Sequence, residues 1–175
     1  DAVFVAIGAH LAKKVNIPAQ EASKILDAVS FLKEADENSD NKPLLGRRVA
    51  IYGGGNTAMD AARTAKRLGA DEAMIIYRRD REHMPAHEFE VDEALSEGVK
   101  IHWLSTIKNM ETSSITVEKM QVVDGKAVPT GEYETLEADS LILALGQEAD
   151  TDFLKHIEGI TFKEDGTTVE VNPSM

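Results

Sequence analysis

Residues Arg48 to Arg79 read RVAIYGGGNTAMDAARTAKRLGADEAMIIYRR, and this stretch decides the expected fold. Its first segment, 49–52, is apolar without alternation, which is typical of a strand covered on both faces of a parallel sheet. Three glycines follow, and Gly53, Gly55 and Ala58 form the pattern G-x-G-x-x-A, the dinucleotide-binding fingerprint with a small third residue. In this fingerprint the first glycine permits a tight turn, the second admits a pyrophosphate close to the backbone, and the small third residue lets the helix approach the sheet.

The segment 56–68 predicts the helix of a β-α-β unit. Its apolar positions recur at helical spacing and are nearly all alanine, which suits close packing on a sheet, and Gly69 follows as a stop. The helix would present the free amides of 55–57 and the positive end of its dipole, which together form an anion site. A second strand over 73–77 completes the unit. The alternative is a β-α-β unit whose glycines only make a tight turn.

The residues after the second strand indicate which dinucleotide binds. NAD-binding units usually place an Asp or Glu about 20 residues past the glycines, where it binds the ribose hydroxyls. This chain instead has Arg78 and Arg79, with Arg81 close behind. Two guanidinium groups can fork around a 2′-phosphate, so the sequence predicts NADP(H) rather than NAD(H). The alternative is that these arginines are only a solvated basic strand end.

Composition and charge restrict the function further. The net charge of −12 argues against nucleic acid and anionic membranes as partners, but residues 47–81 carry eight Lys/Arg and four Asp/Glu, a net charge of +4 that suits a polyanionic ligand. The chain of 175 residues has no cysteine, hence no thiolate nucleophile and no iron–sulfur cluster of its own. It has neither a run of 18 apolar residues nor a signal peptide, so we expect a soluble, cytoplasmic protein.

The remaining chain predicts elements on both sides of this unit. Before it we expect a strand over 1–9, a helix over 19–35 and a solvated linker over 34–43. After it we expect a helix over 86–97, a strand over 99–104, an antiparallel meander over 107–138 with a type I′ turn at Asp124-Gly125, a buried strand over 140–145, a short helix at 153–156 and a hairpin about Asp165-Gly166. The expected fold class is α/β, a Rossmann-like NAD(P)-binding domain with a parallel sheet and an antiparallel β-meander.

The segments GGGNTAMDAARTAKRLGA, YRR, MPAHEFE, EGV and ALGQEAD resemble the NADPH-binding domain of the glutamate synthase small subunit. They resemble more loosely the NADPH domains of dihydropyrimidine dehydrogenase and adrenodoxin reductase. In this family the NADPH domain is inserted into an FAD domain of glutathione-reductase type. The resemblance implies that residues 1–43 are a stub of the flanking FAD domain with a helix and linker, that 44–146 form the NADPH-binding domain, and that 147–175 start the return to the FAD domain.

The resemblance also implies roles for individual residues. It assigns the pyrophosphate to Gly54, Gly55, Asn56 and Thr57, and the 2′-phosphate to Arg78 and Arg79 with help from Arg81. It assigns the nicotinamide side to Ala144, Leu145 and Gly146, and it makes Glu90 a weaker candidate for a ribose or amide contact. Ala6-Ile7-Gly8 and Ala144-Leu145-Gly146 resemble the two crossings between the domains.

The family's electron route then implies the cofactors and partners. NADPH would pass hydride to FAD, with FAD and iron–sulfur clusters elsewhere in the parent protein. The partners would be the FAD-binding domain of the same parent chain and a large glutamate synthase subunit or another electron-accepting subunit. Because the FAD fingerprint and the cluster cysteines are missing here, we expect a fragment that does not turn over alone.

No catalytic side chain is predicted, because hydride transfer between a nicotinamide and a flavin depends on positioning more than on acid–base chemistry. No metal site is predicted either, since Pro85 separates His83 from His87 and no third ligand is marked. Two alternatives stay open. One is a related reductase that serves a ferredoxin-like carrier or a pyrimidine-reducing domain, and the other is a non-catalytic NADP(H)-sensing or docking module. A longer parent sequence with an FAD fingerprint and cysteine clusters would favour the reductases.

Overall fold

The computed structural model describes residues 4–9, 11–12, 17–18, 24–36 and 43–171. The chain divides into two compact units, residues 14–146 and residues 1–13 together with 147–175. In the described chain the larger unit has three helices, α1 (Ala28–Asp36), α2 (Asn56–Arg67) and α3 (Glu88–Ser96). None of the helices described is both long and apolar enough to cross a membrane.

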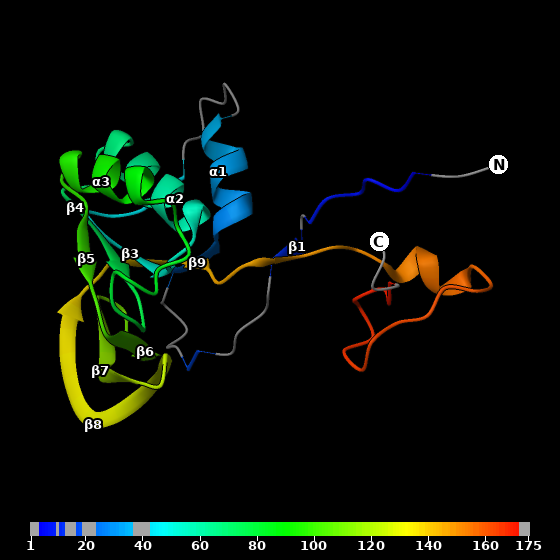
Figure 1. The fold of residues 1–175 in the computed structure, drawn as a ribbon. Helices are drawn as coiled ribbons and strands as arrows, with labels where there is room; N and C mark the ends of the chain where they lie inside the picture. Colours follow the sequence, from blue (N-terminus) through cyan, green and yellow to red (C-terminus); the bar gives the residue numbers. More distant parts are fainter. Residues whose placement is uncertain (1–3, 10, 13–16, 19–23, 37–42, 172–175) are drawn as a thin grey trace. The chain divides into compact units, whose positions relative to one another are not determined.

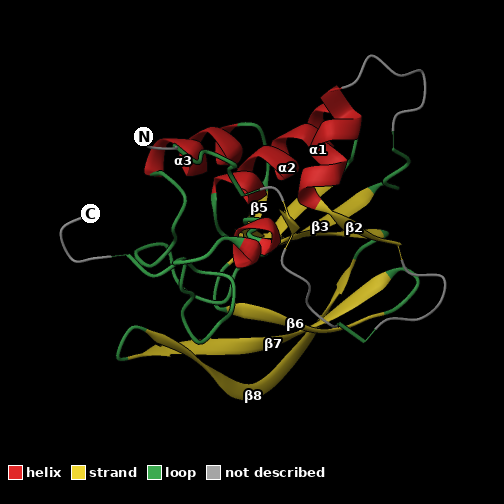
Figure 2. Ribbon diagram, turned by 90° about the vertical axis from the view of Figure 1, so that its right-hand side faces the viewer, coloured by secondary structure: helices red, strands yellow, loops and turns green. Residues whose placement is uncertain are grey.

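Two sheets form the larger unit. The first is parallel, in the order β2-β9-β3-β4-β5, and its strands are β2 (Lys24–Asp27), β9 (Ser140–Ala144), β3 (Arg48–Gly53), β4 (Glu72–Ile76) and β5 (Lys100–His102). The second is antiparallel, and its strands are β6 (Ser105–Met110), β7 (Ser114–Val123) and β8 (Lys126–Glu137). The helices cover one face of the parallel sheet, and the antiparallel sheet lies on the other face (Figures 1 and 2). This arrangement confirms the predicted α/β class with a meander.

Strand β3 lies at the centre of the parallel sheet and is buried on both faces. Ile51 pairs with Ile75 of β4 and with Ile142 of β9. Val49 and Ile51 belong to the core on the helical side, whereas Ala50 belongs to the core shared with the meander. The uninterrupted apolar run of β3 follows from this double covering.

Helix α2 packs on the sheet through its small side chains. Four alanines along its length are fully buried: Ala58, Ala61, Ala62 and Ala65. Since no larger side chain intervenes on this face apart from Met59, the helix axis can approach the sheet closely and its N-terminus is held directly beyond the end of β3. The predicted β-α-β unit is therefore confirmed.

The meander also follows the sequence prediction. Asp124 and Gly125 both have positive φ, 50° and 72°, as a type I′ turn requires. They join β7 and β8, which pair antiparallel from Val123↔Lys126 to Ser114↔Glu137 with one irregularity after Glu118. Strand β8 begins directly after the turn, at Lys126, because its pairing with β7 extends back to the turn.

The N-terminal prediction is wrong in two places. The helix predicted over 19–35 begins only at Ala28, because residues 24–27 pair with β9 and the Asp27 carboxylate caps the helix by accepting the Ser30 N–H (2.9 Å). The strand predicted over 1–9 is absent from residues 4–9, which are exposed and pair with no strand in the described chain. The predicted segments 1–3, 19–23 and 37–42 lie outside the described residues.

Strand β2 and helix α1 belong to the larger unit, although the sequence analysis began the central domain at residue 44. Strand β2 is the edge strand of the parallel sheet, and Phe31 of α1 lies in the core on the helical side. The smaller unit contains β1 (Leu11–Ala12) antiparallel to β10 (Gln147–Glu148), a 3₁₀ helix η1 (Asp152–His156) and an antiparallel bridge between Phe162 and Val169 around the turn at 165–166.

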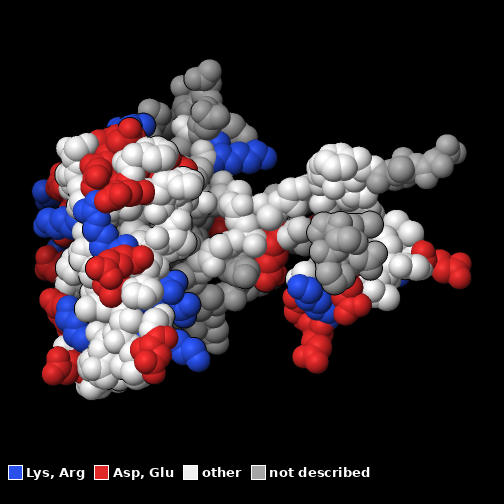
Figure 3. Space-filling view, viewed as in Figure 1, with Lys and Arg blue, Asp and Glu red and all other residues white. Residues whose placement is uncertain are grey.

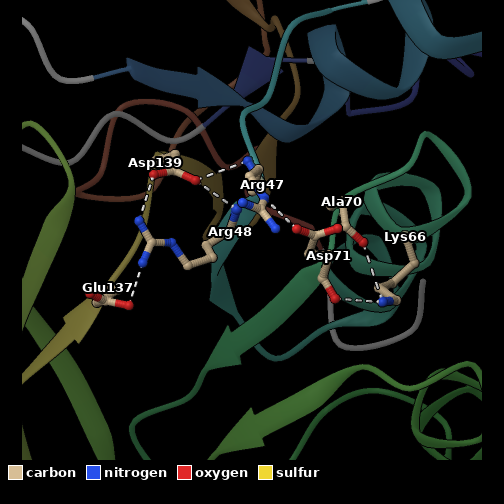
Figure 4. Close-up of polar contacts among 7 residues, drawn as sticks. All are labelled: Arg47, Arg48, Lys66, Ala70, Asp71, Glu137 and Asp139. Atoms are coloured by element: carbon tan, nitrogen blue, oxygen red, sulfur yellow. Dashed lines mark hydrogen bonds and ion pairs between the residues drawn. The ribbon is translucent and has the colours of Figure 1, made fainter.

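Ion pairs tie the elements of the larger unit together at its surface. Lys/Arg and Asp/Glu side chains are interspersed over the face of this unit in Figure 3. At the amino ends of β3 and β9, Asp139 accepts the backbone N–H groups of Arg47 (2.9 Å) and Arg48 (2.8 Å) and the Arg48 guanidinium (3.1 Å) (Figure 4). Gly46 makes room for this contact, since a Cβ there would lie 2.5 Å from the Asp139 Cβ. The contacts fix where both strands begin.

Replacing Asp139 with alanine should therefore lower the free energy of unfolding by about 1–3 kcal/mol at pH 7, because charge-assisted hydrogen bonds are lost. The Arg48 guanidinium lowers the pKa of Asp139. A carboxyl group with a lowered folded pKa stabilises above its unfolded pKa and loses this effect as the pH falls, so the difference from wild type should shrink below about pH 4. Urea denaturation at pH 7 and pH 3.5 measures both effects.

Glu137→Ala is the control, because that side chain is 77% exposed. A loss of stability in Asp139→Ala that is the same at both pH values would contradict this explanation.

Candidate dinucleotide-binding site

The glycine turn after β3 lies where three strand ends meet. Gly53 pairs with Ala144 at the end of β9, and a Cβ on Gly53 would lie 2.2 Å from the Ala144 carbonyl oxygen. A Cβ on Gly54 would lie 2.4 Å from ring carbons of Tyr77, which follows β4. Next to Gly55, by contrast, a Cβ would meet nothing within 4 Å. The first two glycines are thus required by protein packing, and the third presents an open backbone.

The helix N-terminus at this turn has backbone amide groups that are unpaired in the described chain. Gly55 is the N-cap of α2, and its carbonyl accepts the N–H groups of Ala58 (2.9 Å) and Met59 (3.3 Å). Among the residues described, no side chain forms a capping hydrogen bond to the helix, and its first turn holds no acidic residue. Within the described chain, the N–H groups of residues 55–57 have no acceptor. They combine unsatisfied donors with the positive end of the helix dipole.

The loop that follows the arginines is bound to the same turn. The Gly54 carbonyl accepts the Ala86 N–H (3.0 Å), and the Asn56 side-chain oxygen accepts the His87 N–H (3.0 Å). The oxygen of Asn56, a predicted pyrophosphate ligand, is therefore engaged by the protein. These two bonds hold the loop and the glycine turn in one arrangement.

The three predicted arginines have different surroundings. Arg78 is exposed and forms no ion pair with any residue that the structure describes. Arg79 is half-buried, and its Nε donates to the Tyr77 hydroxyl (3.2 Å). Arg81 forms ion pairs with Asp92 (2.5 Å) and Glu88 (3.7 Å) of α3. The charge of Arg81 is thus already balanced by carboxylates, whereas the other two are available to a ligand.

The ion pairs neutralise most of the arginines in the basic stretch 47–81. Five of its seven guanidinium groups have a carboxylate partner: Arg47, Arg48, Arg63, Arg67 and Arg81. Of the arginines in this fully described stretch, only Arg78 and Arg79 have none. The unpaired guanidinium groups therefore lie at the carboxyl end of β4. The glycine turn lies at the same end of the sheet, after β3.

Glu90 lies in the first turn of α3 and takes part in a contact between helices. Its carboxylate pairs with Arg63 of α2 (3.4 Å), and Glu93 and Glu97 pair with the same guanidinium (2.8 Å each). Hydrogen bonds from Arg67 and Arg63 lower the pKa of Glu97. This cluster joins α2 to α3, and it gives Glu90 a partner within the protein.

The predicted nicotinamide-side residues lie at the end of β9. Ala144 is the last residue of the strand, the half-buried Leu145 follows, and the exposed Gly146 has φ of 104°. Strand β9 flanks β3 on the side opposite to β4. The chain proceeds from β3 to β4 on one side, while β9 occupies the other, so the strand order reverses at β3. In open α/β sheets, ligands bind beyond the carboxyl ends of the strands at such a switch point.

Sequence reasoning missed Tyr77. The sequence predicts Tyr77 only as the last residue of a strand, whereas in the structure its side chain contacts Gly54, Arg79 and the loop 80–87. An aromatic residue directly before two arginines is a weak signal in the sequence, since its partner Gly54 is 23 residues away.

The sequence matches the pyridine nucleotide-disulphide oxidoreductase family over residues 1–175. The chain therefore belongs to this family. It is 38% identical over 170 residues to the NADP(+)-dependent formate dehydrogenase subunit beta of Moorella thermoacetica, covering 88% of this chain and 24% of that protein. It is 33% identical over 168 residues to the glutamate synthase [NADPH] small chain of Azospirillum brasilense, covering 84% of this chain and 35% of that protein.

A search of solved structures shows the same fold. FprA of Mycobacterium tuberculosis, solved in complex with NADPH, superposes with a TM-score of 0.69 at 18% identity, covering 95% of this chain and 53% of FprA. The chain spans about a quarter of the formate dehydrogenase subunit that it matches. The resemblance to the glutamate synthase small subunit family is confirmed, and these relatives are oxidoreductases.

The glycine turn gives a pair of variants with opposite expectations. Gly54→Ala should lower the free energy of unfolding by about 1–3 kcal/mol, because its methyl group collides with the buried Tyr77 ring. Gly55→Ala should change it by less than about 0.5 kcal/mol, since its φ of −92° and ψ of 175° suit any residue and the methyl group meets no atom. Thermal unfolding followed by circular dichroism measures both. Equal losses would show that Gly55 is also packed against protein.

Proposed function

We propose that this chain is the NADPH-binding module of a flavin-dependent oxidoreductase resembling the glutamate synthase small subunit. The observation that carries the proposal is the pairing of two unsatisfied anion-binding features at one edge of the sheet. These are the amide groups of 55–57 and the uncompensated guanidinium groups of Arg78 and Arg79. A dinucleotide with a 2′-phosphate has a pyrophosphate and a further phosphate to match them.

The residues present fit NADPH in the following way. Gly53, Gly54 and Ala58 shape the turn and the helix approach, while Gly55, Asn56 and Thr57 would bind the pyrophosphate. Arg78 and Arg79 would bind the 2′-phosphate, and Arg81, held by Asp92, would assist them at longer range. Ala144, Leu145 and Gly146 would line the nicotinamide side. Glu90 is the weakest candidate, since it is already engaged by Arg63.

NADPH would supply the hydride, and this chain would bind and orient it. The nicotinamide would face FAD held by the FAD-binding domain of the same parent chain. The division of the chain after residues 13 and 146 supports the proposal that residues 1–13 and 147–175 adjoin that domain, whereas residues 14–43 group with the nucleotide-binding unit. In the absence of cysteine, disulfide chemistry and iron–sulfur clusters would both belong to other parts of a cytoplasmic parent protein.

The final electron acceptor is a separate proposal. A large glutamate synthase subunit is one candidate partner, because one relative is a glutamate synthase small chain. A different electron-accepting subunit is the second, because the formate dehydrogenase subunit beta is more similar in sequence. NADP(H) use is common to both relatives by name, so the module's role does not depend on which acceptor is correct.

Titration calorimetry with NADPH and NADH at one salt concentration tests the proposal. Wild type should bind NADPH more tightly, and Arg78→Ala with Arg79→Ala should weaken NADPH by about a hundredfold while changing NADH little, because charge-assisted bonds to the 2′-phosphate are lost. Arg67→Ala is the control, since it removes the same charge from an arginine paired with Glu97. It should leave both affinities unchanged.

Two results would contradict the proposal. Equal weakening of NADPH and NADH in the double variant would remove the 2′-phosphate assignment. A wild-type chain with equal affinities for both dinucleotides would remove the preference for NADPH itself.

A further inference from the structure

The Tyr77 side chain contacts the glycine turn, Arg79 and the loop that follows the arginines. The residue is 6% exposed. Its ring lies against Gly54 on one side and meets the Trp103 ring edge to face, with 6.3 Å between centroids. Its hydroxyl donates to the His83 carbonyl (2.6 Å) and accepts from Arg79 Nε (3.2 Å).

The backbone around Tyr77 is also fixed. The Tyr77 N–H donates to the His102 carbonyl (3.0 Å), and the Tyr77 carbonyl accepts the Ser105 N–H (2.9 Å). The Arg79 carbonyl accepts the Leu104 N–H (3.1 Å). The segment that carries the two arginines is therefore held by backbone hydrogen bonds to residues 102–105, where β5 ends and β6 begins.

The contact between Tyr77 and Arg79 restricts the guanidinium group. The Arg79 Cζ lies 6.0 Å from the centre of the Tyr77 ring, and Nε is engaged by the hydroxyl. With Nε bound, the two terminal nitrogens of Arg79 remain as donors for a ligand. An arginine that the protein already holds in one orientation loses less conformational entropy on binding a phosphate than a freely rotating arginine does.

We propose that Tyr77 is a positioning residue for cofactor specificity. It packs on the glycine turn, orients Arg79 through its hydroxyl and binds the loop 80–86 through the His83 carbonyl. This inference rests on the proposed function, because it assumes that Arg79 binds the 2′-phosphate of NADPH. The ring supports the glycine turn for any dinucleotide, whereas the hydroxyl acts on the recognition of the 2′-phosphate through Arg79 and also holds the loop through the His83 carbonyl.

The variant Tyr77→Phe separates the hydroxyl from the ring. Calorimetric titration should show the dissociation constant for NADPH rising about threefold to tenfold, as expected for loss of the hydrogen bond that orients Arg79, with that for NADH changing less than about twofold. The fragments 2′,5′-ADP and 5′-AMP should show the same difference without the nicotinamide.

Tyr52→Phe is the matched control. It also removes a tyrosine hydroxyl that is hydrogen-bonded inside the larger unit, to Thr106 Oγ1 (2.5 Å) on the side of the meander. It should leave the ratio of the NADH and NADPH dissociation constants unchanged. Circular dichroism shows whether both variants keep the wild-type fold.

A double-mutant cycle tests whether Tyr77 acts through Arg79. In the Arg79→Ala background, Tyr77→Phe should have no further effect on the NADPH dissociation constant, because the group that it orients is gone. An unchanged ratio in folded Tyr77→Phe, or the same loss with and without Arg79, would overturn the inference while the proposed function stands. A wild-type chain without preference for NADPH would overturn both.

Discussion

The close approach of backbone and ring at the glycine turn is the constraint on which the rest of the structure depends. Gly53 meets the Ala144 carbonyl, and Gly54 meets the Tyr77 ring, at distances that exclude any Cβ. Because of these contacts, the carboxyl ends of β3, β4 and β9 converge at one point. The alanine face of α2 then brings the helix N-terminus to the same place. This arrangement is possible because Gly53 and Gly54 have no side chain.

Charge pairing within the protein leaves two arginines without a carboxylate partner beside this turn, among the residues that the structure describes. The chain carries a net charge of −12, so a polyanionic ligand is repelled by the protein as a whole. Carboxylates on α3 and before β9 neutralise the arginines of α2 and of the amino end of β3. Arg78 and Arg79 are left uncompensated beside free amide groups. Because salt screens charges beyond about 8 Å under physiological conditions, these two nearby guanidinium groups would act on a ligand here more strongly than distant carboxylates do.

The sequence was sufficient for the features that depend on local spacing. The β-α-β unit, the meander and its type I′ turn are determined by glycine positions and by periodicity, and all three are present. Strand β2 was missed because Ile25 and Leu26 also fit a helical pattern, and only the Asp27 cap marks where α1 begins. Residues 4–9 looked like a strand from composition, yet β pairing requires a partner that local sequence does not supply.

The site was predictable in part for the same reason. The glycine fingerprint and the arginine pair are local patterns. Other contacts join residues that are 11 to 27 positions apart in the chain: Arg81 with Asp92, Glu90 with Arg63, and Tyr77 with Gly54. Such contacts depend on tertiary packing, so sequence could not show that Arg81 and Glu90 already have partners. The ligand roles of the site residues remain predictions.

The most direct test of the central claim is an NMR titration of the ¹⁵N-labelled chain with 2′,5′-ADP. The account predicts that backbone amide shifts concentrate at 55–57 and 78–79, where the helix N-terminus and the uncompensated arginines lie. Arg47 and Arg48, whose amides are bound to Asp139 and whose side chains line a polar groove at the opposite edge of the sheet, should not respond. Shifts concentrated at that groove, with none at 55–57, would contradict the account.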